Sequence, residues 1–357
     1  MNNKLTLLVT LKDRSSFTKR FCDYLSLIEY PFFVIFADGS LGDENEKIFK
    51  NLKNQNFLYE YIRFPPDQIL TNYYEKLFVA VKKVQTPYIV LADNDDFPII
   101  EGQLKALEFL EFNNDYVGCT GRTGGVIIHP SSNLPYGKKV LNLSYYCHYM
   151  DVSVALDQTN ALERIKSYLN NFYSIFYSIY RTDSIKINFE AMQKLDFSDL
   201  GIFELFFSYL QLTQGKIKTL NSLIYVRQKG SSQAAASQKD WFHRLFYSAW
   251  LSDLKQALCY VSEMIAKREQ RNCQDVYDTL YSDFVVRQRK RFLPLKFYFC
   301  ANFNLFFNKE YVKYLIYYKV FKISPSIGEK WGYYSLTKIT SKSNLNKIKA
   351  IITKEYP

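Results

Sequence analysis

A cluster of acidic side chains follows one strongly apolar segment of the sequence. Residues 88–97 read YIVLADNDDF, so Asp93, Asp95 and Asp96 come directly after a run typical of a buried β-strand. Neighbouring carboxylates repel one another unless a cation is present, and a group that offers only oxygen ligands suits Mg²⁺ or Mn²⁺ together with substrate phosphates. The sequence therefore predicts a metal site at the end of this strand. The alternative is an Asp-rich turn that caps a helix starting near Glu101.

A second candidate carboxylate belongs to an apolar helix predicted at residues 202–213, which ends at Gly215. Glu204 lies near the start of this helix among Phe, Leu and Tyr side chains. Desolvation by such neighbours raises the pKa of a carboxylate, as a general base requires. In the alternative interpretation, Glu204 or Asp199 only complements the dipole at the helix N-terminus.

A basic segment of small residues lies further along the chain. Residues 225–238 read YVRQKGSSQAAASQ and carry Arg227 and Lys229 near their start. The composition predicts a mobile loop, which is either a plain connector or a lid whose cations close over a diphosphate.

The elements that position these residues follow from the hydrophobic pattern. Strands are predicted from apolar runs at residues 5–11, 31–37, 57–64, 88–93 and 116–125, and a helix is predicted at residues 69–84. Ser15 and Ser16 are predicted to cap the helix after the first strand. This alternation is typical of βα units in a mostly parallel sheet, whose ligands bind beyond the carboxyl ends of the strands. From Trp241 onward the pattern is helical, which divides the chain into predicted domains at 1–235 and 236–357.

The net charge of +11 lies in the last third of the 357-residue chain. Residues 1–240 carry 26 basic and 26 acidic side chains, whereas residues 241–357 carry 20 and 9. Such asymmetry indicates an anionic partner, either a lipid surface or a nucleic acid. The segment RQRKRFLPLKFYF at residues 287–299 suits an anionic membrane interface. Its alternative interpretation is a solvated helix face with a core behind it.

Other sequence features exclude several classes of protein. No window of 18 residues is apolar enough to span a membrane, and the N-terminal apolar run is typical of a strand rather than a secretory signal. We therefore expect a cytoplasmic protein. Its six cysteines show no CxxC spacing, so the sequence predicts reduced thiols rather than a disulfide framework or a zinc site.

Taken in order, these residues resemble the family-2-type glycosyltransferases with the GT-A fold, particularly bacterial enzymes that build surface polysaccharides. The resemblance covers about residues 5–230. It implies an α/β, Rossmann-like, mostly parallel sheet flanked by helices, here with a C-terminal helical region. Asp93-Asn94-Asp95 matches the family's DxD motif, which holds a metal ion and the donor's ribose and diphosphate.

The resemblance implies roles for further residues that bind the donor. Thr10 and Asp38 stand where the family's first two strands end, and the Asp of the second turn contacts the nucleobase. Lys76 lies near a basic residue that precedes the DxD strand in the family. YVRQKG at residues 225–230 resembles a Y-R-Q-H-G segment, with Lys229 in place of the His. Without this His, the metal ion would be coordinated by the Asp cluster and the donor's phosphates.

The catalytic base is also carried over from the family pattern, in which an acidic residue precedes a helix-ending Gly by about eleven positions. Glu204 stands eleven positions before Gly215, with Asp199 as the nearby alternative.

Together these features predict an inverting glycosyltransferase that depends on Mg²⁺ or Mn²⁺. It would move a sugar from a nucleoside-diphosphate donor to a hydroxyl of a lipid-linked glycan at the inner face of the cytoplasmic membrane. The missing Q-x-x-R-W signature favours a single addition over polymerisation. One alternative is a sugar nucleotidyltransferase, whose usual Gly-rich first turn is absent from LVTLKDRSS. The other is a nucleic-acid-binding protein, which leaves the Asp cluster unexplained, so no nucleic acid is expected as a partner.

Overall fold

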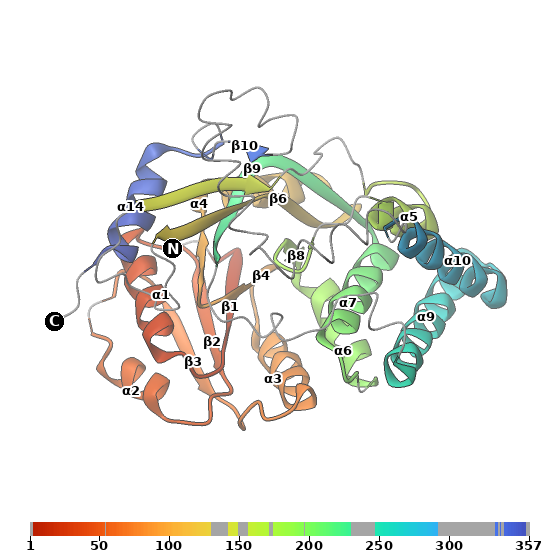
Figure 1. The fold of residues 1–357 in the computed structure, drawn as a ribbon, viewed down its shortest axis with the longest axis horizontal. Coiled ribbons are helices and arrows are strands. Elements are labelled where there is room, and N and C mark those ends of the chain that lie inside the picture. Colours follow the sequence, from red (N-terminus) through yellow and green to blue (C-terminus); the bar gives the residue numbers. More distant parts are fainter. Residues whose placement is uncertain are drawn as a thin grey trace, which may run out of the picture.

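The N-terminal part of the chain forms the predicted alternation of strands and helices (Figure 1). The computed structural model describes residues 3–53, 55–129, 142–148, 156–170, 174–195, 197–229, 247–291, 333–334, 336 and 339–354. The first elements are β1 (Leu5–Leu11), α1 (Ser15–Leu27), β2 (Phe33–Asp38), α2 (Glu44–Asn51), β3 (Tyr59–Arg63), α3 (Leu70–Lys83) and β4 (Tyr88–Asp93). The strands and the helix predicted for this region are confirmed, with small differences at their ends.

The start of α1 differs from its prediction. Arg14 is the N-cap, in the left-handed backbone region and without a side-chain capping hydrogen bond, so Ser15 and Ser16 are the first two helical residues instead. The predicted serine caps were therefore wrong.

The chain then adds strands on the other side of β4 and more helices. These elements are β5 (Asp96–Pro98), α4 (Ile100–Phe112), β6 (Tyr116–His129), β7 (Asn142–His148), α5 (Ala161–Asn170), β8 (Ile179–Arg181), α6 (Thr182–Gln193), α7 (Leu200–Gln214), β9 (Lys216–Lys229), α9 (Ser248–Glu269), α10 (Cys273–Arg291), β10 (Tyr333–Tyr334) and α14 (Lys342–Ile352).

Among the described residues these strands form one mixed sheet in the order β10-β7-β6-β8-β4-β1-β2-β3, while β9 pairs with β5 and β6. β1 runs parallel to both β2 and β4. In this register Thr10 lies beside Asp93, and Leu11 lies beside Asp38. The ends of three neighbouring strands are therefore level, which places the predicted site residues along one edge of the sheet.

The core explains why this edge is rigid. β1 and β4 are buried along almost their whole length, as expected for parallel strands covered by helices on both faces. Aromatic side chains fill much of the space between sheet and helices, with Phe36 in contact with the rings of Phe21, Phe49 and Phe57. The α/β fold class with flanking helices and a helical C-terminal region is confirmed, but the sheet is mixed rather than mostly parallel, because β5, β7, β8 and β10 pair antiparallel to their neighbours.

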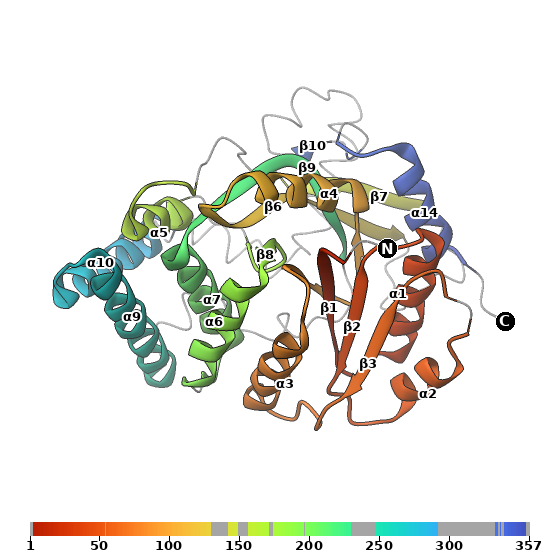
Figure 2. The ribbon, with the colours of Figure 1, turned by 180° about the vertical axis from the view of Figure 1, so that it is seen from behind.

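The C-terminal helices lie at two places on this fold. α9 packs on α7, and α10 packs on α9 and α5, whereas α14 packs on α1 at the opposite end of the molecule (Figures 1 and 2). The hydroxyl of Tyr145 donates to the carbonyl of Leu345 at 3.2 Å, and Lys354 pairs with Asp23 on α1 at 3.1 Å. The last described residues therefore pack against helix α1 of the first predicted domain. The predicted domain boundary near residue 235 stays a prediction.

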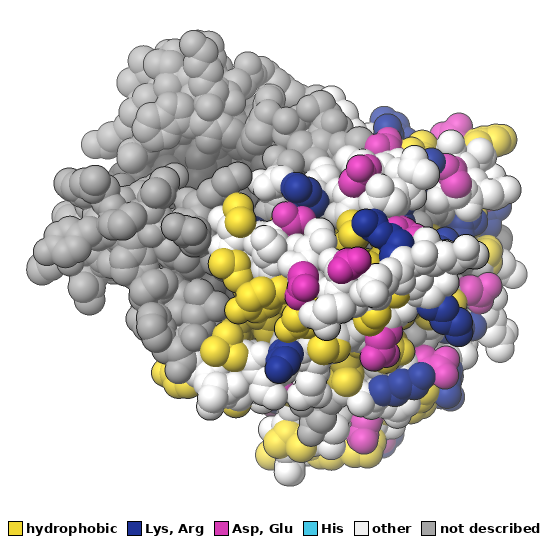
Figure 3. All heavy atoms as spheres, turned by 90° about the vertical axis from the view of Figure 1, so that its right-hand side faces the viewer, with side chains coloured by type: hydrophobic (Ala, Val, Ile, Leu, Met, Phe, Trp, Pro, Cys, Tyr) yellow, Lys and Arg dark blue, Asp and Glu magenta, His cyan; other side chains and the backbone are white. Residues whose placement is uncertain are grey.

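Apolar side chains are exposed on the α9–α10 side of the molecule. Figure 3 looks onto this side, where hydrophobic side chains gather in one area among acidic and basic ones. The exposed apolar residues of the two helices include Leu251, Tyr281, Val285 and Val286. No helix within the described ranges is both long and apolar enough to cross a lipid bilayer.

The segment predicted as a mobile loop begins instead as a strand. Tyr225–Lys229 form the end of the 14-residue β9, where Arg227 pairs in register with Asp96 of β5 and Gly125 of β6. The loop prediction was wrong for these residues because two strands offer backbone hydrogen bonds to them. Residues 230–238 of the predicted loop lie outside the described residues.

Candidate active site

A cavity of about 860 Å³ opens at the carboxyl ends of β1 and β4. The residues predicted from the sequence that line this cavity are Thr10, Lys76, Asp93, Asn94, Asp95, Glu204 and Arg227. Asp38, Asp96 and Asp199 lie outside the lining, and the side chain of Lys229 lies outside the described part of the structure. The fold therefore brings most of the predicted donor, metal and base candidates to one cavity, although their roles stay predictions.

Helix α1 fixes the acidic turn that follows β4. The amide of Asn94 donates to the hydroxyl of Thr18 at 3.1 Å, and the buried guanidinium of Arg20 donates to the backbone carbonyl of Asp95 at 3.3 Å. The hydroxyl of Tyr24 donates to the carbonyl of Pro98 at 3.0 Å. One helix thus holds the turn and β5 at three points, which orients the carboxylates before any ligand arrives.

Asp93 lies at the centre of the polar contacts in the cavity. Its carboxylate accepts hydrogen bonds from the hydroxyls of Thr10, at 3.1 Å, and Tyr177, and Arg227 lies 3.8 Å away. Burial among protein atoms and the charge of Asp95 raise the pKa of Asp93. Burial beside Asp93 also raises the pKa of Tyr177, so its hydroxyl remains a proton donor.

Asp95 and Asp96 point to different partners. Oδ2 of Asp95 lies 3.2 Å from Nη2 of Arg14, at the N-terminus of α1. Oδ1 of Asp96 instead accepts from Nε of Arg227 at 3.3 Å, and Asp96 lies outside the lining of the cavity. The charge of Asp96 raises the pKa of Arg227, so this guanidinium stays fully protonated. Asp96 therefore contacts Arg227, and its role as a metal ligand stays a prediction.

The Asp93–Asp95 pair suits a divalent cation whose remaining ligands are water or the oxygens of a substrate. Among the described residues, no three Asp, Glu, His or Cys side chains are grouped so as to hold a metal ion by themselves. Asp93 and Asp95 nevertheless offer oxygen atoms alone, and their mutual repulsion is relieved by a cation. Mg²⁺ and Mn²⁺ bind in this way, through one or two carboxylates completed by phosphate oxygens and water.

The helix that carries Glu204 begins two residues earlier than predicted. Asp199 is its N-cap, and its carboxylate accepts hydrogen bonds from the backbone N–H groups of Gly201, at 2.8 Å, and Ile202. Glu204 consequently lies in the second turn and lines the cavity. The preceding residue, Phe203, stacks on Tyr74 with ring centroids 4.4 Å apart. Asp199 therefore fits the interpretation in which a carboxylate complements the dipole at the helix N-terminus. Glu204 instead lies where a substrate in the cavity would contact it.

A buried ion pair lines the cavity on the side of β2. The ammonium of Lys76 pairs with Oδ2 of Asp67 and also donates to the carbonyl of Leu11 at 3.0 Å. Oδ1 of Asp67 is buried and accepts no hydrogen bond from the described residues. Gly39 lies directly against this carboxylate, because a Cβ there would be 2.3 Å from Oδ1. Oδ1 of Asp67 is therefore buried against Gly39, beside the cavity that the pair lines.

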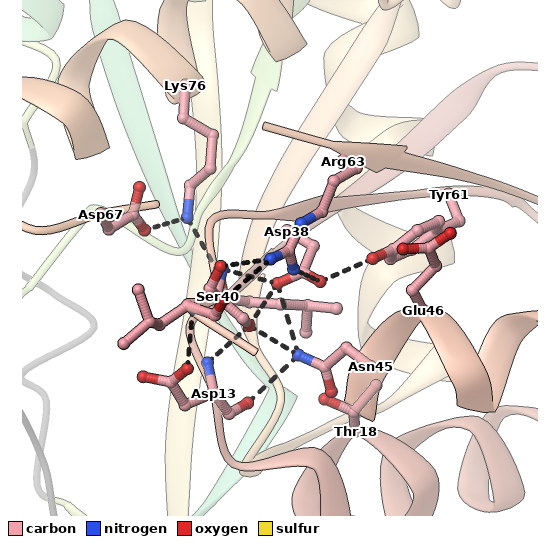
Figure 4. A network of polar contacts seen from close by, with 12 residues as sticks. Asp13, Thr18, Asp38, Ser40, Asn45, Glu46, Tyr61, Arg63, Asp67 and Lys76 are labelled. Carbon is pink, nitrogen blue, oxygen red and sulfur yellow. Dashed lines mark hydrogen bonds and ion pairs between the residues drawn. The ribbon is translucent and has the colours of Figure 1, made fainter. Parts of the chain in front are cut away.

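Asp38 is the centre of a network next to this pair (Figure 4). Its carboxylate accepts hydrogen bonds from Tyr61 at 2.6 Å, from Arg63 at 2.8 Å, from the backbone of Ser40 at 2.9 Å and from Asn45 at 3.3 Å. Burial acts to raise the pKa of Asp38, but these hydrogen bonds outweigh it and lower the pKa. Both carboxylate oxygens are engaged, so Asp38 shapes the turn after β2, and its contact with a nucleobase stays a prediction.

Comparison with known proteins supports the fold. No protein-family model and no curated protein sequence matches this chain. The structure is similar to S. aureus TarS residues 1–349 in complex with UDP-GlcNAc, with a TM-score of 0.52, 15% identity, and coverage of 80% of this chain and 73% of that one. The same TarS fragment with UDP gives a TM-score of 0.51 at 15% identity over 88% and 78% of the two chains. For the longer S. aureus TarS structure the TM-score is 0.50 at 13% identity, and the match spans 43% of that chain. At such identities the similarity shows the shared GT-A fold alone.

Several residues that shape the cavity were missed by the sequence analysis. Arg14, Asp67 and Tyr177 contact the predicted residues but were not themselves named as candidates. Asp67 carried one usable signal, since it directly follows Pro65-Pro66 at the end of a predicted strand. Nothing in the local sequence indicated Arg14 or Tyr177, because their positions depend on the tertiary fold.

Proposed function

We propose that this chain is a glycosyltransferase that moves a sugar from a nucleoside-diphosphate donor to a hydroxyl of an acceptor. The observation that carries the proposal is that one cavity contains both the Asp93–Asp95 pair and Glu204. The shared fold with TarS, whose structures contain UDP-GlcNAc and UDP, supports the same interpretation.

The donor is proposed to lie along the ends of the strands. The ion pair of Asp67 and Lys76 lines one part of the cavity, and we place the nucleobase beside it. Asp93 and Asp95 lie beyond β4, separated from β2 by β1, so a ligand that reaches both groups spans about 10 Å. Mg²⁺ or Mn²⁺ held by the two carboxylates would neutralise charge that develops on the leaving diphosphate.

Glu204 is proposed as the general base. Its carboxylate takes the proton of the acceptor hydroxyl while that oxygen attacks the anomeric carbon from the face opposite the diphosphate, which inverts the configuration. Arg227 beside Asp93 adds positive charge near the leaving group. Asp96, which lies outside the cavity lining, pairs with this guanidinium and keeps it in place.

The acceptor is proposed to be a glycan on a lipid carrier at an anionic membrane surface. The basic excess of residues 241–357 and the exposed apolar side chains of α9 and α10 support this proposal (Figure 3). Vesicles that contain anionic lipid should bind the protein, and charge reversal of Arg289, Lys290 and Arg291 to Glu should abolish the binding. Equal binding of the variant would contradict the proposal.

The donor site is tested by thermal stabilisation with UDP, GDP, dTDP and CMP, each with and without Mn²⁺. We expect one diphosphate to raise the melting temperature only with Mn²⁺, and Asp95→Ala to abolish the shift. Asp278→Ala, an exposed change on α10, should keep it. Stabilisation by a nucleoside triphosphate alone would favour a sugar nucleotidyltransferase. If no nucleotide acts, salt-dependent retention on DNA or RNA would favour the nucleic-acid-binding alternative.

A further inference from the structure

Arg14 is held in the cavity by a turn with an unusual backbone. Asp13 and Arg14 both have left-handed backbone angles, with φ of 53° and 52°. This backbone region is unfavourable for residues other than glycine. The turn is maintained by Ser40 and Leu41: Asp13 N–H donates to the Ser40 hydroxyl at 2.6 Å, and Leu41 N–H donates to the Asp13 carboxylate at 3.0 Å. Backbone strain that neighbouring residues hold in place is typical of functional sites.

The turn directs Arg14 to the acidic pair. Its Nη2 lies 3.2 Å from Oδ2 of Asp95, and its guanidinium carbon lies 4.0 Å above the ring of Phe17. The Asp95 side chain is only 4% exposed, whereas that of Arg14 is 26% exposed and lines the cavity. Nε of Arg14 is buried and donates to no acceptor among the described residues. The guanidinium therefore keeps one donor unused while another is tied to Asp95.

This ion pair occupies one of the two oxygens of Asp95 through which a metal ion could bind. A divalent cation and the guanidinium cannot both lie against Oδ2 of Asp95, because like charges repel at such short distances. A cation that binds through Oδ2 therefore displaces Arg14 from this oxygen. A displaced guanidinium remains in the cavity, next to the place where a diphosphate would lie, and its planar fork suits phosphate oxygens.

We propose that Arg14 is an exchangeable counter-ion: it neutralises Asp95 in the donor-free protein and passes to the donor's diphosphate when the metal and the donor bind. The inference rests on the proposed function. Removing the charge of Arg14 should therefore change the affinities for the two ligands in opposite directions. The metal ion should bind more tightly because it loses a competitor, and the diphosphate should bind more weakly because it loses a ligand.

The test measures Mn²⁺ and UDP binding separately in Arg14→Gln and Arg14→Asn. Both variants are neutral, and Asn also suits the left-handed backbone, so that one of them serves if the other fails to fold. Mn²⁺ binding is followed by the electron paramagnetic resonance signal of the free ion, and UDP binding by calorimetry at saturating Mn²⁺. Lys19→Gln, an exposed change on the same helix, is the control.

In the absence of nucleotide, we expect both variants to bind Mn²⁺ about tenfold more tightly than the wild type does. In the presence of Mn²⁺, we expect them to bind UDP about tenfold more weakly. Both factors correspond to the loss of one unit charge at this distance in a partly exposed site. Weaker binding of both ligands would mean that Arg14 only supports the turn. Weaker UDP binding with unchanged Mn²⁺ binding would make Arg14 a plain diphosphate ligand. Either result overturns the exchange. A wild-type protein that binds UDP but never Mn²⁺ also overturns it, and one that binds no nucleotide overturns the proposed function as well.

Discussion

The ammonium of Lys76 and the carboxylate of Asp67 form an ion pair in which the two side chains are only 1% and 2% exposed, although both line the cavity. Burial lowers the pKa of Lys76 and raises that of Asp67, so each charge depends on the other. A buried pair of this kind is weak evidence for stability, because hydrophobic side chains can often replace both members without loss. The place of both residues in the cavity lining instead favours a role in binding.

Substitutions at this pair separate stability from binding. Lys76→Met should destabilise the protein by about 3–5 kcal/mol, because it leaves the buried Asp67 without its cation. The double change Lys76→Met with Asp67→Leu should recover most of this loss. Both variants should lose nucleotide binding, measured by calorimetry with UDP. A double variant that is stable and binds UDP as the wild type does would remove the pair from the donor site.

The sequence was sufficient to predict the elements that carry the site, because strands such as β1 and β4 are buried on both faces and read as continuous apolar runs. It also predicted that Asp93 and Glu204 belong to one site, 111 positions apart in the chain, through the resemblance to a family. The partners of these residues were not predictable. Arg14 reaches Asp95 only through a left-handed turn that Ser40 and Leu41 maintain.

At Asp38 the motif position indicated a nucleobase contact, which stays a prediction, but it did not indicate the hydrogen-bond network around this carboxylate. The turn after β2 was recognised, but the donors that surround Asp38 come from β3 and α2, and no local pattern announces them. The end of β9 was missed for a similar reason. Residues 225–238 as a whole are small and polar enough for a loop, but β5 and β6 both pair with the first of them.

The lowered pKa of Asp38 predicts how stability depends on pH. Because the folded state favours the carboxylate, its contribution is complete above the unfolded pKa of about 3.9 and is lost as the pH falls through the lower folded pKa. Asp38→Asn should therefore cost about 2–3 kcal/mol at pH 7, since two charge-assisted donors lose their acceptor. Urea unfolding at several pH values should show this cost shrinking below pH 4.

The control for this experiment keeps the charge of Asp38. Asn45→Ala removes one donor at 3.3 Å but leaves Arg63 and Tyr61 in place. It should lower stability by about 1 kcal/mol and retain the loss of stability in acid. A cost of Asp38→Asn that stays constant down to pH 2.5 would mean that hydrogen-bond geometry, rather than charge, determines the effect.

The end of α9 offers a prediction about the backbone alone. Gln270 is the exposed C-cap of this helix, with φ of 53°, and its N–H donates to the carbonyl of Ala266. Gln270→Gly should raise stability by about 1 kcal/mol, because glycine adopts this conformation without strain. Glu263→Gly, inside the same helix and also exposed, should lower it by about 1 kcal/mol. Melting temperatures that move in the same direction would contradict this explanation.

The two carboxylates of α7 can be told apart by substitution. Glu204→Gln removes the proposed base but keeps the shape of the side chain, so sugar transfer should fall by about 10²–10⁴-fold while UDP affinity changes less than about twofold. Asp199→Asn should keep both activity and stability, because Asn is an equally good N-cap, and Asp199→Ala should cost about 1 kcal/mol of stability. Transfer is measured as release of the nucleoside diphosphate, with Glu101→Gln as an exposed control. If Asp199→Asn were inactive while Glu204→Gln remained active, the base would be Asp199, and the hydrogen bonds that it accepts from Gly201 and Ile202 would have to open in the reacting complex.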